Sequence, residues 1–157
     1  MAIRQIVKLG DEVLRKKSFE VTDFGEKTHQ LLEDMKDTLE KAQGVGLAAV
    51  QVGVLRKIFI ILKGDKIEEG VYEFLNPEII STSGEQYDTE GCLSVPGKWG
   101  EVKRPNKLTI KYQDRFGKPQ KLKAEGFLAR AICHENDHLN GVIYIDKADN
   151  LRSETKK

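Results

Sequence analysis

Apolar residues recur at helical spacing over residues 25–42 of the chain. The positions that share one face of such a helix are Leu31, Leu32, Met35, Leu39 and Ala42. Thr22 and Asp23 are good N-cap residue types before this segment, and Gly44 is a good stop after it. The pattern therefore predicts an amphipathic N-terminal helix. His29 falls on its polar face, where we expect a solvated side chain.

Beyond that helix, apolar residues follow the short runs and alternation that are typical of strands. Three β-branched and aromatic runs lie at residues 57–62, 71–76 and 78–82. The dipeptide Asn76-Pro77 predicts a turn between the last two runs. Further along, turn residues at 114–117 separate an alternating segment, 107–113, from a weaker one at 120–125. The segments 107–113 and 120–125, with the turn between them, predict an antiparallel hairpin with one solvated face.

Helical spacing returns between Gly126 and Gly141. The apolar and reactive positions that share a face there are Leu128, Ala131, Ile132, Glu135 and Leu139. Two helices with several short antiparallel strands indicate an α+β fold, and we expect short antiparallel sheets packed around this second, central helix. We expect one catalytic domain over residues 1–150 and a charged, flexible tail over residues 151–157.

The composition of the chain argues against a nucleic-acid-binding protein and against a membrane-spanning one. The 157 residues carry 26 Lys and Arg against 25 Asp and Glu, so the net charge of +1 gives no electrostatic footprint for nucleic acid. The longest aliphatic and aromatic run, residues 58–62, is far too short to span a membrane. Charged residues also interrupt the N-terminal segment, so we expect a cytoplasmic protein whose two cysteines stay reduced and available as ligands.

A metal-binding pattern lies within the second helix. In the segment from His134 to His138, two histidines stand four residues apart, which places both imidazoles on one helix face. Glu135 follows the first histidine, where a carboxylate can reach a water molecule bound to the metal. The sequence therefore predicts that this central helix binds a catalytic metal ion.

The third metal ligand decides between enzyme classes. Metal-dependent proteases with this pattern take it from downstream, but Tyr144 stands where one such family needs histidine, and Glu154 in the tail is the one downstream glutamate. Of the two cysteines, Cys133 would point about 100° away from the histidine face, so we expect a packed core thiol there. Cys92, in a segment flanked by Gly and Pro, is the better candidate. A Cys, His, His ligand set suits zinc or ferrous iron equally well.

Three motifs together resemble the peptide deformylases, which remove the N-formyl group from nascent bacterial polypeptides. They are GVGLAAVQ at residues 44–51, EGCLS at residues 90–94 and HENDHL at residues 134–139. The resemblance implies that Cys92, His134 and His138 bind one divalent metal ion. Fe²⁺ is the expected ion, and Zn²⁺ or Ni²⁺ can replace it.

The resemblance also implies the catalytic roles and the partners. Glu135 would be the general acid and base, while Gln51 and the backbone N–H of Leu93 would stabilise the developing oxyanion. The partners would be nascent N-formylated polypeptides, with a transient ribosome contact and no membrane. Where many relatives carry Gln before the first metal histidine, this chain has Cys133.

Residues around the metal helix are candidates for the substrate pocket. Arg130 and Ala131 lie four and three positions before His134, and Phe127 lies seven positions before it, so all three share the face of the metal histidines. Together with Val45, the apolar residues among them could line a pocket for methionine. Phe127 and Ala131 could equally be core residues, and Arg130 could supply an aliphatic stem or point to solvent.

Two further expectations concern the backbone and the support of the metal helix. Gly46 and Gly91 permit close backbone approach, so an extended peptide could pair there as an added strand. The family resemblance implies that Asp137 pairs with Arg104 and steadies the metal helix, although a solvated Asp137 is the plain alternative.

Two other functions compete with a deformylase. One is a small metallopeptidase, which the missing downstream ligand disfavours. The other is a structural Cys, His, His metal site in a binding module, which would need no general base at Glu135.

Overall fold

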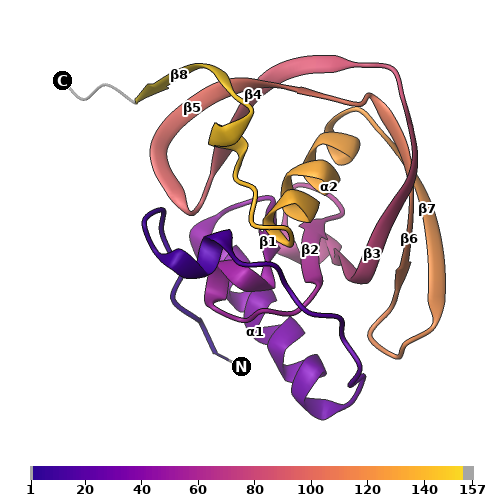
Figure 1. Cartoon of the computed structure of the whole chain (residues 1–157). Coiled ribbons are helices and arrows are strands. Elements are labelled where there is room, and N and C mark those ends of the chain that lie inside the picture. The colour runs from indigo at the N-terminus through magenta and orange to yellow at the C-terminus, as the bar shows by residue number, and fades with distance from the viewer. Residues whose placement is uncertain (1, 154–157) are drawn as a thin grey trace.

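The computed structural model describes residues 2–153, and its largest element is a five-stranded antiparallel sheet (Figure 1). The order across this sheet is β1-β2-β3-β6-β7. The strands are β1 (Gly46–Ala48), β2 (Ile58–Leu62), β3 (Val71–Ser83), β6 (Lys107–Gln113) and β7 (Pro119–Glu125). Strands β6 and β7 form the expected hairpin, with Leu108 opposite Ala124 and Ile110 opposite Leu122.

A second, three-stranded antiparallel sheet has the order β4-β5-β8. It consists of β4 (Gln86–Cys92), β5 (Val95–Arg104) and β8 (Asp149–Ser153). The prediction of a flexible tail from residue 151 is wrong for residues 151–153, because β8 pairs with β5 and places Trp99 opposite Arg152. Gly100 permits this pairing, since a Cβ there would lie 2.8 Å from the Cβ of Ala148. Residues 154–157 lie outside the described residues.

Within residues 2–153, two α-helices complete the α+β fold that the sequence predicts. Helix α1 spans Glu26–Ala42, and helix α2 spans Phe127–His138. Four short 3₁₀-helices connect the other elements: η1 (Glu12–Arg15), η2 (Ala49–Val52), η3 (Ile67–Glu69) and η4 (Tyr144–Asp146). Helix α2 lies at the centre of Figure 1, where it contacts β1, β2 and β7 of the large sheet and β5 of the small one. This is the central helix of the predicted fold.

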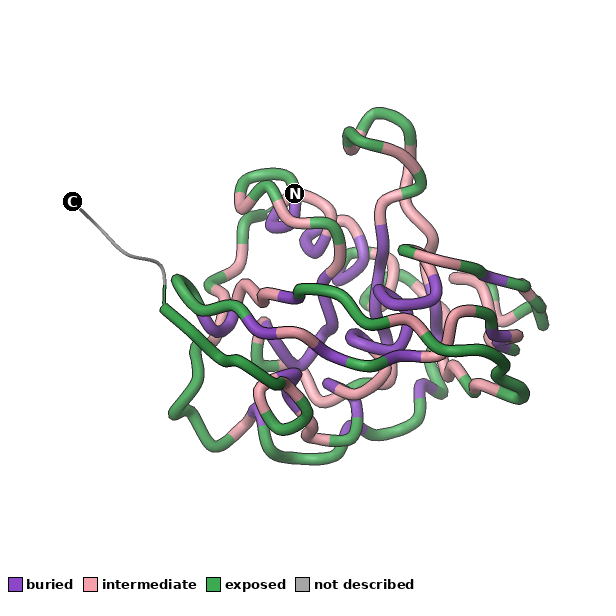
Figure 2. Tube along the Cα trace, turned by 90° about the horizontal axis from the view of Figure 1, so that it is seen from above, coloured by how far each residue is buried: buried purple, intermediate pink, exposed green. Residues whose placement is uncertain are grey.

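The alternation of side chains along β2 explains how the sheet is covered on both faces. Phe59 and Ile61 belong to a core cluster with residues of α2, whereas Ile58 and Ile60 belong to a cluster with residues of α1. Successive side chains of a strand point to opposite faces, so a continuous apolar run marks a strand buried on both sides. Figure 2 shows buried segments through the middle of the molecule and exposed segments around them.

Two local expectations are wrong. Residues 71–83 form one strand rather than two, because the segment at Asn76 and Pro77 is an irregularity in the β3–β6 pairing and not a turn. Asn76 adopts a φ of 49°, and its side chain bonds to Val21 and Gln113 instead of ending the strand. His29 is half-buried rather than solvated: its Nε2 lies 2.8 Å from the carbonyl oxygen of Arg115.

None of the helices within residues 2–153 is both long and apolar enough to cross a bilayer.

Candidate metal centre

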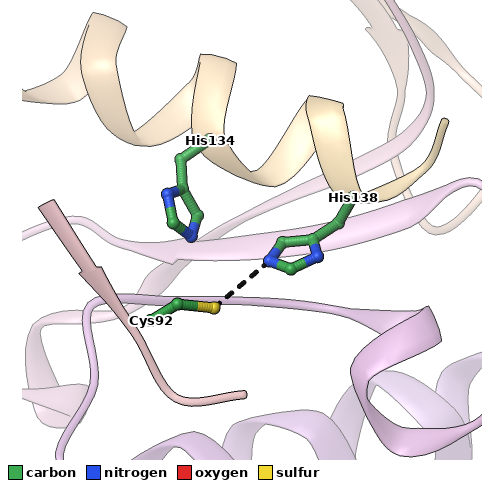
Figure 3. Close-up of side chains that lie close together, drawn as sticks. All are labelled: Cys92, His134 and His138. Atoms are coloured by element: carbon green, nitrogen blue, oxygen red, sulfur yellow. Dashed lines mark hydrogen bonds between the residues drawn. The ribbon is translucent and has the colours of Figure 1, made fainter. Parts of the chain in front are cut away.

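Three side chains from two elements converge in the space between the sheets. Cys92 ends β4, and His134 and His138 stand one turn apart on α2, with their rings aimed toward the cysteine sulfur (Figure 3). The Sγ of Cys92 lies 3.4 Å from Nε2 of His138, and one ligand atom from each residue lies within 4.8 Å of the others. One soft thiolate and two imidazoles form a set that holds zinc or ferrous iron, so the residues suit the metal that the sequence predicts.

A break in the strand pairing orients Cys92. The β4–β5 register shifts between Glu90 and Cys92, which is the kind of irregularity that redirects a side chain next to a functional site. Leu93 and Ser94 then form the turn into β5. Cys92 therefore leaves the regular strand just where the chain turns back, facing α2.

Glu90, to which the sequence interpretation gave no individual role, forms hydrogen bonds with three side chains around this group. Its Oε1 lies 2.9 Å from Nδ1 of His134, and its two oxygens accept from Nε and Nη2 of Arg104, each at 2.9 Å. Arg130 donates to the same carboxylate through Nη1 at 2.5 Å. Because the Nδ1 side of His134 faces Glu90, the Nε2 side is the one that faces Cys92 and a metal.

Arg104 connects Glu90 to the C-terminal end of α2. Its Nη1 donates to Oδ2 of Asp137 at 2.7 Å, the pairing that the family resemblance implies. Asp137 also lies 3.2 Å from the ammonium of Lys147. The alternative of a solvated Asp137 is therefore wrong.

The charges around the ligands set their protonation. Burial alone would raise the pKa of Glu90, but hydrogen bonds from Arg104 and His134 outweigh it and hold the pKa at about 2. Burial lowers the pKa of His138 to about 3, so this imidazole is neutral and able to coordinate. Burial would also lower the pKa of His134, yet its hydrogen bonds to Cys92 and Glu90 raise it to about 10. A metal must therefore displace a proton there.

Glu135 is buried beside the ligands, and its Oε1 has no hydrogen-bond partner within residues 2–153. Burial raises the pKa of this carboxyl to about 7. Gly46 of β1 makes room for it, because a Cβ on Gly46 would lie 2.8 Å from Oε2 of Glu135. A buried carboxyl that titrates near neutral pH can exchange protons with a reacting group.

The side-chain amide of Gln51 is held in one orientation. Its Oε1 accepts from the backbone N–H of Ala48 at 2.9 Å, so its NH₂ group points the other way. That group donates to Oγ of Ser94 at 3.1 Å and lies 3.6 Å from Sγ of Cys92. Gln51 therefore presents a fixed pair of N–H donors at the metal group.

A cavity of about 480 Å³ opens onto these residues. Val45, Phe127, Arg130 and Ala131 all line it, as do His134 and Glu135. Phe127 is 62% exposed, so its interpretation as a core residue is wrong, whereas Ala131 both packs in the core and lines the cavity. Arg130 is buried against Glu90 and does not point to solvent.

Two strand edges border the same cavity. Strand β1 is the first strand of the large sheet and β4 is the first strand of the small one, so within residues 2–153 each has one edge without a neighbouring strand. Gly46 of β1 and Gly91 of β4 both line the cavity between them. The backbone groups of an extended peptide could pair with either edge.

Cys133 is not part of the metal group. It is buried in the core cluster of α2 and the large sheet, and burial raises the pKa of its thiol to about 11. This location is the one expected from helix geometry.

Comparisons with known proteins match nearly the whole chain. A family model described as polypeptide deformylase matches residues 3–154. A peptide deformylase from Caldicellulosiruptor bescii is 53% identical over 154 residues, covering 98% of this chain and 90% of that protein. One from Halothermothrix orenii is 49% identical, covering 98% and 99%.

Solved structures show the same fold. A peptide deformylase from Legionella pneumophila superposes with a TM-score of 0.91 at 44% identity, covering 95% of this chain and 88% of that one. A peptide deformylase from Synechococcus elongatus in complex with actinonin gives a TM-score of 0.87 at 38% identity, covering 94% and 79%.

Proposed function

The chain belongs to the polypeptide deformylase family, and on that premise we propose how its own residues remove an N-formyl group. It is a hydrolase that releases formate from the formyl-methionine at the start of newly made polypeptides. Water adds to the formyl carbon, the C–N bond breaks, and the products are formate and a free amino terminus.

Cys92, His134 and His138 hold the metal ion in this proposal, and Fe²⁺ is the ion that we propose, with Zn²⁺ or Ni²⁺ able to replace it. When bound, the metal supplies Lewis acidity that makes a water molecule more acidic and polarises the formyl carbonyl. Glu90 fixes the ring of His134 through Nδ1. Arg104 holds both Glu90 and Asp137, so β4 and α2 keep the ligands together.

Glu135 moves the proton. Its carboxylate takes the proton of the attacking water and passes it to the amine nitrogen as the C–N bond breaks. The raised pKa of about 7 suits both steps, because the group accepts and releases a proton near neutral pH. Oε1, which has no partner among the described residues, is the atom available for this exchange.

Gln51 and Leu93 stabilise the negative charge that develops on the formyl oxygen. The Nε2 of Gln51 is already oriented by Ala48 and Ser94, so little reorganisation is needed when the charge appears. The backbone N–H of Leu93 is the second donor. Removing one such donor from an oxyanion site costs about 10²–10³ in rate.

The substrate binds as an added strand between β1 and β4, where Gly46 and Gly91 allow its backbone to approach. Val45, Phe127 and Ala131 accept the methionine side chain, and Arg130 closes the cavity wall beside Glu90. The partners are nascent N-formylated chains, met in the bacterial cytoplasm through transient contact with the ribosome.

The observation that carries this mechanism is the buried Glu135 carboxyl, whose Oε1 has no hydrogen-bond partner within residues 2–153, next to three side chains that could hold a metal ion. The test is anaerobic purification with metal analysis and assay of formyl-Met-Ala-Ser on the same sample. We expect formate release, with no cleavage of internal peptide bonds. We expect Glu135→Gln to lose about 10²–10⁴-fold in kcat while metal content stays unchanged. An inactive, iron-loaded wild type would overturn the proposal.

A further inference from the structure

Tyr144 lies beside the metal-binding side chains and has no role in the mechanism above. It belongs to η4, is 1% exposed, and its ring stacks on that of His134, with the ring centroids 5.9 Å apart and the planes inclined by 27°. Aromatic rings attract each other at centroid separations of about 4.5–7 Å. We propose that Tyr144 is a positioning residue, which holds the imidazole plane of His134 in the orientation that metal binding requires.

The hydrogen bond to Glu90 restrains only one edge of the His134 ring. Oε1 of Glu90 meets Nδ1 of His134 at 2.9 Å, which fixes the direction of that nitrogen. The second side-chain torsion of histidine is broad, so the ring can still tilt about this contact. A second ring that packs against the imidazole face limits the tilt. Glu90 and Tyr144 therefore restrain two different motions of the same ligand.

The hydroxyl of Tyr144 anchors the stacked ring to the small sheet. It donates to the carbonyl oxygen of Lys98 on β5 at 2.9 Å. Because the oxygen bonds to β5, the ring is the part of Tyr144 that contacts His134. This is the position at which one family of metal-dependent proteases has a histidine ligand. Here the residue at that position supports a ligand.

The backbone that carries Tyr144 is held by its neighbours in η4. The carboxylate of Asp146 accepts from the backbone N–H of Ile143 at 3.1 Å and from the guanidinium of Arg15 at 2.6 and 3.1 Å. The metal-binding residue Cys92 packs against the buried apolar cluster to which Tyr144 belongs. The other buried members of that cluster are Leu14, Val95, Val102 and Ile143.

The expected effects on metal affinity follow from these two contacts. Loss of a partner that orients a metal ligand costs about 10- to 100-fold in affinity, so removal of the Tyr144 ring should have an effect of this size. Removal of the hydroxyl alone keeps the ring, and should cost at most about fivefold, the equivalent of one neutral hydrogen bond. The inference rests on the proposed function, because it takes His134 as a ligand of the catalytic metal.

The test uses Co²⁺ as the probe metal, since its absorption bands report the geometry of its ligands. Tyr144→Met replaces the ring with a flexible apolar side chain that fills irregular space. It should bind Co²⁺ about 10- to 100-fold more weakly than wild type in chelator competition, with altered bands. Tyr144→Phe should retain the wild-type bands and most of the affinity. This rescue separates the stacked ring from the hydroxyl.

Phe74→Leu is the matched control, because it removes a fully buried ring far from the ligands. The aromatic neighbours of Phe74 are Phe59, Tyr72 and Tyr112. This variant should lose thermal stability but keep the wild-type Co²⁺ bands and affinity. A loss of affinity equal to that of Tyr144→Met would overturn the inference, because the effect would then be one of general stability.

A further measurement needs no variant. In the zinc-loaded wild type, nuclear Overhauser contacts should join the ring protons of Tyr144 to those of His134. Their absence, or unchanged Co²⁺ bands and affinity in Tyr144→Met, would overturn the inference. Failure of wild type to bind one Co²⁺ per chain, or a sulfur-to-cobalt band that persists in Cys92→Ala, would instead overturn the metal site of the proposed function.

Discussion

Glu90 and His134 form the contact that joins the metal-binding helix to the strand that supplies the thiolate, with Oε1 and Nδ1 2.9 Å apart. Glu90 lies two residues before Cys92 on β4, and His134 lies on α2. A carboxylate behind a ligand imidazole fixes the ring orientation and makes the coordinating nitrogen more basic. One hydrogen bond therefore influences both the position and the donor strength of a metal ligand.

Replacing Glu90 with Gln should weaken metal binding without removing any ligand. Loss of such a supporting partner costs about 10- to 100-fold in metal affinity, which chelator competition with Zn²⁺ measures. Glu73→Gln is the matched control, because Glu73 also pairs with an arginine, Arg115, but contacts no metal ligand. Equal losses in the two variants would show that the effect is a general one of fold stability.

Removing the sulfur of Cys92 should reduce metal binding, whereas removing the sulfur of Cys133 should not. Cys92→Ala removes a ligand, so metal content after dialysis should fall to a small fraction of the wild-type value. Cys133→Ala removes a protonated core thiol, and it should retain one metal ion per chain at a modest cost in thermal stability. Metal loss in Cys133→Ala but not in Cys92→Ala would refute the ligand assignment.

Gly46→Ala should impair catalysis more than folding. The added Cβ would lie 2.8 Å from Oε2 of Glu135 and 3.2 Å from the backbone oxygen of Ile60, so either the carboxyl or the strand must move. A displacement of about 1 Å at a reacting group can cost 10²-fold, which should appear in kcat for formyl-Met-Ala-Ser. Metal content and the urea midpoint, measured alongside, should change little; wild-type kcat would contradict the prediction.

The metal-free protein should lose stability in acid through Glu90. Its pKa is about 2 in the folded chain and ordinarily 4.5, so its contribution is complete above pH 4.5 and disappears as pH falls toward 2. At 1.36 kcal/mol per pKa unit, the contribution is at most about 3 kcal/mol. Urea unfolding of wild type and Glu90→Gln at pH 6 and pH 3 should give a difference in unfolding free energy that is smaller at pH 3 than at pH 6. A constant difference would rule out this linkage.

The elements with strong apolar periodicity could be predicted from the sequence. Helix α1 begins and ends within one residue of the predicted range 25–42, and β6 matches the predicted 107–113. The two histidines of the metal group could also be predicted, because they stand four residues apart and therefore share one face of α2. The position of Cys92 makes it the better candidate of the two cysteines for the third ligand, and the family resemblance implies that role.

The small sheet could not be predicted in the same way. Strand β4 reads QYDTEGC and has little apolar alternation, while β5 contains a proline and two glycines. These strands are held by backbone pairing, by one buried charged cluster, and by a small apolar cluster to which β5 contributes only Val95 and Val102. Two apolar positions seven residues apart produce no clear hydrophobic period. Glu90 was missed for the same reason: its partners Arg104 and Arg130 are 14 and 40 residues away in sequence, so its burial depends on tertiary structure.

The two open strand edges that flank the cavity bear on how broadly the enzyme can act. Hydrogen bonds from a strand edge engage only the peptide groups of a ligand, which every polypeptide carries in the same arrangement. An enzyme that meets the first residues of many different gene products needs this tolerance. Recognition by β1 and β4 would admit nearly any sequence, because these contacts do not depend on the side chains of the nascent chain.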